Sequence, residues 1–142
     1  MAIVTRRSPL GRSSCVYGKE KTFSGAGAAK PLARHVSRRK YVVRALTTLG
    51  RILTAQGDAD GATAELRSAV ALADELGSPL LRWQSRTALA LAEREGGTGE
   101  RADELAREVA EIIDAIAGGL SPEHAATYLA AAPVVQALDL AR

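Results

Sequence analysis

The chain has 142 residues, of which 46% are hydrophobic and 25% charged, a balance that fits one ordinary globular domain. Aromatic residues make up only 4%, so we expect a core of Ala, Leu, Val and Ile between closely approaching helices. Cys15 is the only cysteine and the two histidines lie far apart, which excludes an intramolecular disulfide and predicts no metal site. Because no apolar run resembles a membrane span or a secretory signal, we predict a cytoplasmic protein.

Charge is divided unevenly along the chain. Residues 1–44 hold eleven basic residues and the single acid Glu20, a net charge of +10, whereas residues 45–142 carry −7. Residues 1–37 are rich in Gly, Ser and Pro and have almost no periodic apolar spacing, so they cannot bury enough apolar surface to offset the entropy of ordering. We therefore predict a disordered basic arm over residues 1–37. Its composition also overlaps with that of transit peptides, although it lacks an amphipathic pattern.

Helical periodicity begins near Val36. The first helix is predicted to be apolar on one face, through Val42, Leu46, Leu49 and Leu53, and polar on another, through Arg44, Thr47, Arg51 and Thr54. Gly57 suits a left-handed end to this helix, and Asp58 suits the N-cap of the next. The second helix repeats the apolar spacing through Ala62, Leu66, Ala69, Ala73 and Leu76, and ends at Gly77.

Further helices follow, and two of them begin with a Ser-Pro pair that is typical of helix starts. The sequence predicts a helix over residues 79–95, which carries Trp83 and Leu89. A longer helix is predicted from Thr98 or Gly99 to Gly118, with an apolar stripe of Leu105, Val109, Ile112 and Ile116. A short helix over 122–131 and a last turn or helix over 133–140 follow. No alternating strand pattern interrupts them, so the fold class is predicted to be all-α.

Two helical pairs show self-similarity with an offset of 40 residues. Leu49, Gly57 and Ala62 recur as Leu89, Gly97 and Ala102, and Gly50 becomes the small residue Ala90. Small residues beside the Leu let the two helices of a pair approach closely. This offset favours a repeat over an accidental helical hairpin.

The first pair resembles the tetratricopeptide repeat, whose pattern runs W-x2-L-G-x2-Y, then a turn Gly, then A-x3-F-x2-A. Leu46 takes the Trp place, Leu49 and Gly50 match, Leu53 takes the Tyr place, and Ala62, Leu66 and Ala69 fill the second helix. The second unit is degenerate, with Arg86 and Glu93 at the Trp and Tyr places and support from Leu89, Ala90, Gly97, Ala102 and Val109. The resemblance implies two tetratricopeptide-like antiparallel hairpins over residues 38–117, an α-α superhelix, with capping helices over residues 118–142.

Three phrases, "SRRKYVVRALTTLGRIL", "ELGSPLLRWQSRTALALA" and "APVVQALDLA", look like the C-terminal region of large actinobacterial-type regulators. In such proteins an ATPase or nucleotidyl cyclase module, or a LuxR-type regulator, carries a helical repeat region. The resemblance covers the terminal scaffold and not the catalytic modules, so it implies no activity for this chain.

Sites that would carry chemistry are weakly supported by the sequence. The stretch Ser24–Pro31, "SGAGAAKP", lacks the spacing of a phosphate-binding loop, and we predict a flexible linker there. Acidic pairs at helix starts suit the helix dipole, and neither Cys15 nor His124 belongs to a nucleophile constellation. We therefore predict no catalytic residue, no cofactor and no enzymatic activity. The basic cluster Arg34–Arg44 suits either a solvated helix start or phosphate contacts.

In the tetratricopeptide family the first helix of each pair lines a concave groove. The resemblance therefore implies that five polar residues face a ligand: Arg44, Thr47, Arg51, Gln84 and Arg94. Arg44 and Arg51 are predicted to contact an acidic peptide, with plain solvent exposure as the alternative.

The sequence thus predicts a noncatalytic scaffold for protein–protein interaction, the C-terminal part of a larger signalling or regulatory protein. A small nucleic-acid-associated protein that uses the basic arm is the alternative. A solenoid needs about three repeats to be stable, so two hairpins predict that the first one packs on the arm, self-associates, or continues a longer protein.

Overall fold

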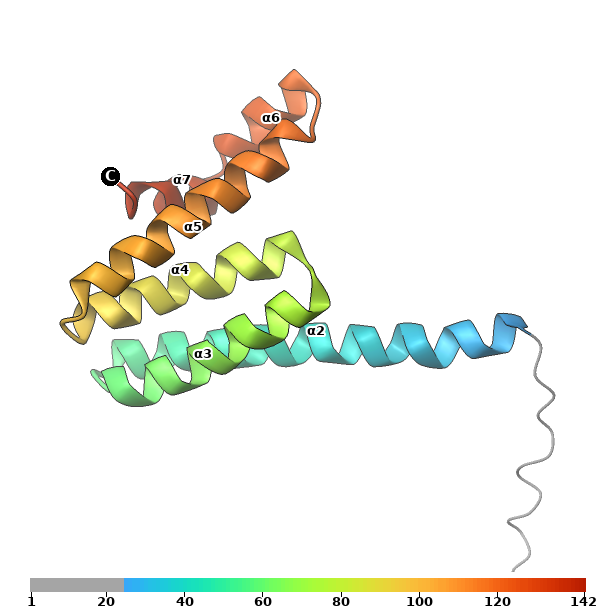
Figure 1. Ribbon diagram of the computed structural model, residues 1–142, viewed down its shortest axis with the longest axis horizontal. Helices are drawn as coiled ribbons and strands as arrows, with labels where there is room; N and C mark the ends of the chain where they lie inside the picture. The colour runs from blue at the N-terminus through green and yellow to red at the C-terminus, as the bar shows by residue number, and fades with distance from the viewer. Residues whose placement is uncertain (1–24) are drawn as a thin grey trace, which may run out of the picture. The chain divides into compact units, whose positions relative to one another are not determined.

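The computed structural model describes the backbone of residues 25–142 and the side chains from residue 35 onward. The chain divides into two units at Val36, and the unit Val36–Arg142 holds the hairpins. Six helices are described (Figure 1): α2 (Gly25–Ala55), α3 (Ala59–Leu76), α4 (Pro79–Glu95), α5 (Gly99–Gly118), α6 (Pro122–Leu129) and α7 (Ala132–Asp139). All regular secondary structure in residues 25–142 is helical, which confirms the predicted all-α class.

Helix α2 begins at Gly25, well before the predicted start near Val36. The predicted arm of residues 1–37 was therefore too long at its C-terminal end, and residues 25–31 form helix instead of a flexible linker. Alanines at positions 26, 28 and 29 have the highest helix propensity, which outweighs the neighbouring glycines. The rest of the predicted arm, with Cys15, lies outside the described residues.

The turn between the two helices of a hairpin occurs twice with the same geometry. Helices α2 and α4 end 40 residues apart, and Gly57 and Gly97 follow them with φ of 84° and 86°. The backbone N–H of Asp58 donates to Leu53 O at 3.0 Å, and that of Thr98 donates to Glu93 O at 2.9 Å. A positive φ favours glycine, so these two glycines end their helices in the same way.

Helix α2 packs on α3 through a face that only partly matches the predicted one, since Leu46 and Leu53 are partly buried against the core as expected. Val43 is buried and Gly50 lies directly under Leu66, whereas Val42 and Leu49 are exposed. The difference has a physical cause. Helix α2 carries two neighbouring apolar stripes, and the stripe beside Gly50 is the one that packs on Leu66, because glycine has no side chain to keep the helices apart. The predicted face thus shares Leu46 and Leu53 with the packed one and differs from it at Val42 and Leu49.

Helix α4 is the central helix of the unit, since both α3 and α5 pack against it (Figure 1). Ala62 and Leu66 of α3 are buried in one core cluster with Leu89 and Ala92 of α4. Trp83 of α4 joins a second cluster toward the C-terminus. This second cluster contains Val109 and Ile113 of α5 and Val134 and Ala137 of α7. The small helices α6 and α7 therefore cover the end of the second hairpin.

Two charged residues of α4 are buried at the positions where the repeat pattern has Trp and Tyr. The Arg86 guanidinium donates to both carboxylate oxygens of Asp74 at 2.9 and 3.0 Å and to Glu108 at 2.7 Å. The Glu93 carboxylate accepts a hydrogen bond from Arg67 at 2.8 Å. Ion pairs from α4 to α3 and α5 thus replace aromatic packing, and each buried charge is paired.

Within the described residues, none of the helices is both long and apolar enough to cross a bilayer.

Candidate partner-binding groove

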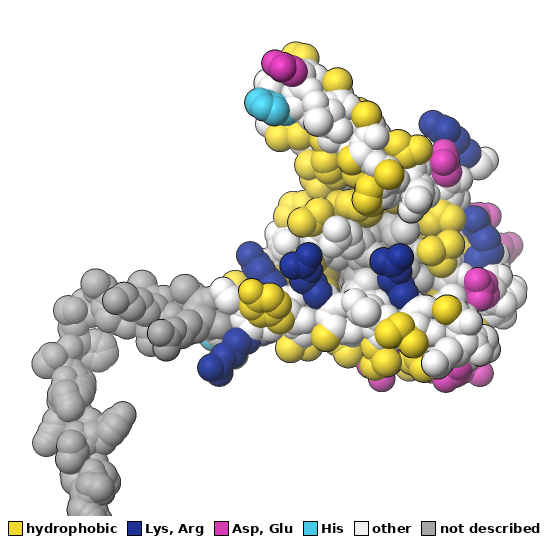
Figure 2. All heavy atoms as spheres, turned by 180° about the vertical axis from the view of Figure 1, so that it is seen from behind, with side chains coloured by type: hydrophobic (Ala, Val, Ile, Leu, Met, Phe, Trp, Pro, Cys, Tyr) yellow, Lys and Arg dark blue, Asp and Glu magenta, His cyan; other side chains and the backbone are white. Residues whose placement is uncertain are grey.

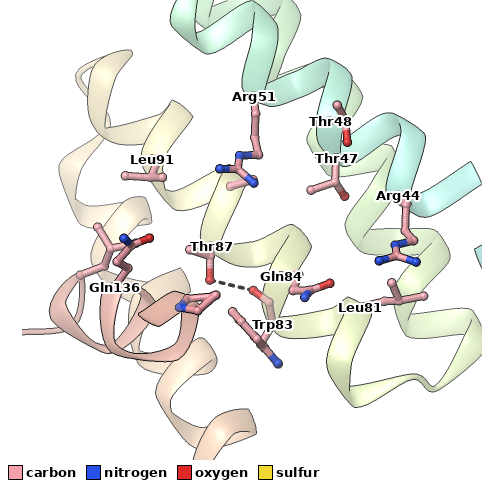
Figure 3. A pocket seen from close by; sticks show the side chains of 13 residues that line it. Arg44, Thr47, Thr48, Arg51, Leu81, Trp83, Gln84, Thr87, Leu91 and Gln136 are labelled. Atoms are coloured by element: carbon pink, nitrogen blue, oxygen red, sulfur yellow. Dashed lines mark hydrogen bonds between the residues drawn. The ribbon is translucent and has the colours of Figure 1, made fainter. Parts of the chain in front are cut away.

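A pocket of about 580 Å³ lies between helices α2, α4 and α7 (Figure 3). We call it the α2–α4 groove. The space-filling view shows it as a hollow with Lys and Arg side chains beside it (Figure 2). Its lining residues are Arg44, Thr47, Thr48 and Arg51 from α2, Leu81, Trp83, Gln84, Thr87, Ala88 and Leu91 from α4, and Pro133, Gln136 and Leu140 from the C-terminal segment.

The two long walls of the groove are built from equivalent positions of the two hairpins. Positions 44, 47, 48 and 51 of α2 line one wall, and positions 84, 87, 88 and 91 of α4 line the other, each 40 residues later. The spacing of three, one and three residues places each set on one side of its helix. Both helices therefore present equivalent positions to the groove, and the 40-residue offset found in the sequence relates its two walls.

The charge of the groove is positive. Arg44 and Arg51 extend from α2 toward α4, and no Asp or Glu is among the described residues that line the pocket (Figure 3). Neither arginine pairs with an acidic side chain of the described part of the chain, in contrast to Arg67, Arg82 and Arg86. The two guanidinium groups are thus available to an anionic ligand.

Hydroxyl groups add hydrogen-bond acceptors between the charges. Thr47 Oγ1 donates to Val43 O at 2.8 Å. Thr87 Oγ1 donates to Trp83 O, also at 2.8 Å (Figure 3). Because each hydroxyl proton is used within its own helix, the lone pairs of both oxygens remain available to N–H donors of a ligand. Gln84 adds an amide that both donates and accepts.

The structure brings four of the five predicted contact residues together. Arg44, Thr47, Arg51 and Gln84 all line the α2–α4 groove. Arg94 does not, because its guanidinium donates at 3.2 Å to both Asp103 and the backbone oxygen of Leu140. Its position at the end of α4 places it beside the start of α5 and the C-terminus, so the prediction for Arg94 is corrected.

Nine of the thirteen lining residues were missed by the sequence reasoning, and three of them show why. Thr87 had a usable signal, since it lies 40 residues after the predicted Thr47. Trp83 was named only as a residue of the helix over 79–95, and it lies at the pocket wall with 4% of its surface exposed. Gln136 comes from α7, whose return toward α4 depends on tertiary packing that no local pattern predicts.

Among the described residues, no group of three or more His, Cys, Asp or Glu side chains could hold a metal ion. The groove itself holds neutral polar groups, two arginines and aliphatic side chains, a set suited to binding through charge and hydrogen bonds. No known protein family, no curated protein and no solved structure matches the chain.

Proposed function

We propose that the chain is a noncatalytic helical-repeat scaffold that binds an acidic, extended segment of a partner protein in the α2–α4 groove. The proposal rests on Arg44 and Arg51, which face a pocket whose described lining residues include no Asp or Glu. The proposal keeps the tetratricopeptide-like interpretation, a place at the C-terminus of a larger signalling protein, and a cytoplasmic location as parts of the same hypothesis.

The spacing of the two arginines suggests the form of the ligand. They are seven residues apart on α2, so about 10 Å separates their positions along the helix axis at 1.5 Å per residue. A peptide in the polyproline II conformation rises about 3.1 Å per residue and turns once every three residues. Carboxylates three residues apart would therefore lie on one side of such a peptide at about the same spacing.

The neutral groups of the groove fit the backbone of the same peptide. An extended chain has unpaired N–H groups, which can donate to the Thr47 and Thr87 hydroxyl oxygens. The partner class is thus a segment with acidic residues at every third position. A nucleic acid would be attracted by charge alone, with a strong dependence on salt concentration and no dependence on the hydroxyl groups.

Fluorescence anisotropy with a labelled peptide that carries Glu at every third position tests the proposal. The Arg44→Glu/Arg51→Glu variant should lose binding by at least tenfold, because two charge-assisted contacts become repulsive. The matched control is Arg107→Glu, an exposed arginine of α5 away from the pocket. Equal binding by the wild type and the double variant would contradict the proposal, as would tighter binding of an oligonucleotide than of the peptide. Circular dichroism checks that helicity is unchanged.

A further inference from the structure

A second surface of α2 is apolar and exposed. Val42, Leu49 and Ile52 are 47%, 42% and 49% exposed, and Ala45 between them is also exposed. Steps of three, four and three residues place these four side chains in one stripe, which we call the outer stripe. It neighbours the packed face of Val43 and Gly50 and does not line the α2–α4 groove.

The second hairpin shows how the equivalent stripe is used. Forty residues later the same positions of α4 are Arg82, Ser85, Leu89 and Ala92. Ser85, Leu89 and Ala92 are 0%, 3% and 0% exposed. Helix α3 packs against α4, and its Ala62 and Leu66 lie in one core cluster with Leu89 and Ala92. The same 40-residue offset relates the turns, the groove walls and these stripes. Because a helix packs on the stripe of α4, a helix is the kind of structure that fits the equivalent outer stripe of α2.

Helix α3 also shows what chemistry such a helix has. Its buried side is formed by small residues and one leucine, through Ala62, Leu66, Ala69 and Ala73. The segment Asp58–Gly77 contains five acidic residues and one basic residue. Helix α2 contains no acidic residue, and Arg39 of α2 already pairs with Glu75 of α3. Opposite charges would thus flank an α3-like helix on α2.

We propose that the outer stripe of α2 is a docking surface for an amphipathic helix of another protein, with an Ala/Leu face spaced as in α3 and acidic flanks. A second copy of this chain is disfavoured as the occupant for two reasons. Packing α2 on α2 brings together helices whose charged residues are all basic. The small-residue faces of α3 and α5 are already buried in their own hairpins, so a second copy has neither to offer.

The probe is a synthetic peptide with the sequence of residues 58–77, titrated into the ¹⁵N-labelled full chain and followed by NMR. We expect chemical-shift changes at Val42, Leu49 and Ile52 and smaller ones at the groove. The Leu49→Asp/Ile52→Asp variant should bind the peptide at least tenfold more weakly, because the apolar contact is replaced by repelling charge. Both side chains are about half exposed, so the fold should persist.

The matched control is Ala126→Asp/Thr127→Asp, which adds the same two charges at exposed positions of α6 that line neither the outer stripe nor the groove. This variant should keep most of its affinity. A peptide with Leu66→Asp should bind the wild-type chain poorly, which tests the apolar face of the helix itself.

Three results would overturn the proposal. The first is binding that is equal in the wild type and in Leu49→Asp/Ile52→Asp. The second is a set of shift changes centred on Leu89 and Ala92, which would mean that the peptide replaces the chain's own α3. The third is a concentration-dependent increase in mass that the double variant abolishes, which would assign the stripe to a second copy. None of these outcomes depends on binding in the groove.

Discussion

Gly50 of α2 lies so close to Leu66 of α3 that a Cβ atom at position 50 would come within 2.3 Å of Leu66 Cγ. In an exposed helix, Gly→Ala stabilises by about 0.5–1 kcal/mol. At Gly50 the overlap involves a fully buried side chain, and overpacking typically costs about 1–3 kcal/mol. We therefore expect Gly50→Ala to lower the free energy of unfolding, measured by urea denaturation.

The control for this substitution is Gly99→Ala at the start of α5, where an added Cβ meets no atom within 4 Å. This variant should be as stable as the wild type or more stable. A Gly50→Ala chain as stable as Gly99→Ala would mean that α2 moves away from α3 at no measurable cost.

The start of α3 depends on one side chain. Asp58 Oδ1 accepts a hydrogen bond from the backbone N–H of Gly61 at 2.9 Å, and Asp58 occupies the N-cap. Removing such a cap typically costs about 1 kcal/mol. Asp58→Ala should therefore lower the midpoint of thermal unfolding followed by circular dichroism. Ser78→Ala is the matched control, because Ser78 caps α4 without a side-chain hydrogen bond; a similar loss in both variants would contradict the role of the Asp58 carboxylate.

The lowered pKa values of two acidic residues, Glu93 and Asp74, predict that the protein loses stability in acid. Burial by itself would raise the pKa of Glu93, but hydrogen bonds from Thr98 and Arg67 hold the pKa below its ordinary value. Burial also opposes ionisation of Asp74, and hydrogen bonds from Arg86 and Arg82 lower its pKa. A pKa that is lower in the folded state gives stability that is present above the unfolded pKa and lost as pH falls.

We expect the free energy of unfolding to decrease below about pH 4, where unfolded carboxylates take up protons. Urea titrations at pH 7, 5 and 3 measure this. In Glu93→Gln the difference between pH 7 and pH 3 should be smaller than in the wild type, although the variant is less stable at pH 7. An unchanged pH dependence in this variant would show that the Glu93 pairs do not contribute.

The Tyr128 hydroxyl and the Trp83 indole N–H are buried near each other, but they form no well-aligned hydrogen bond with each other or with another described residue. A buried polar group without a partner typically costs about 1–3 kcal/mol. Tyr128→Phe should therefore be at least as stable as the wild type, with a gain of up to about 1 kcal/mol in urea denaturation. A loss of stability would contradict this prediction and would indicate that the hydroxyl accepts a hydrogen bond from the Trp83 indole N–H.

Much of the fold follows from local signals, while the packing faces do not. Gly57, Gly77 and Gly97 were identifiable as helix ends because a left-handed backbone favours glycine, and all three have positive φ. The buried side of α2 was identifiable only in part, through Leu46 and Leu53, because Val42 and Val43 are equally apolar. Contact with Leu66 and Gly50 decides between them, and that contact is tertiary.

The same distinction holds for the groove. Arg44, Thr47, Arg51 and Gln84 were predicted from helical periodicity combined with a resemblance, and they meet in one pocket. Gln136 and Pro133 come from a segment whose return to α4 rests on packing around Trp83. Arg94 was predicted from the same polar pattern. The pattern could not predict that Arg94, at the end of α4, would contact Asp103 and Leu140 instead.

The equivalence of the two groove walls has a consequence for how a ligand would be oriented. Arg44 and Arg51 on α2 correspond to Gln84 and Leu91 on α4, so one wall is cationic and the other is neutral and partly aliphatic. A bound segment with acidic residues on one side and apolar residues on the other would have a single preferred rotation about its own axis. The equivalent faces of α2 and α4 carry different side chains at matching positions, and they would thus distinguish the two sides of a bound peptide.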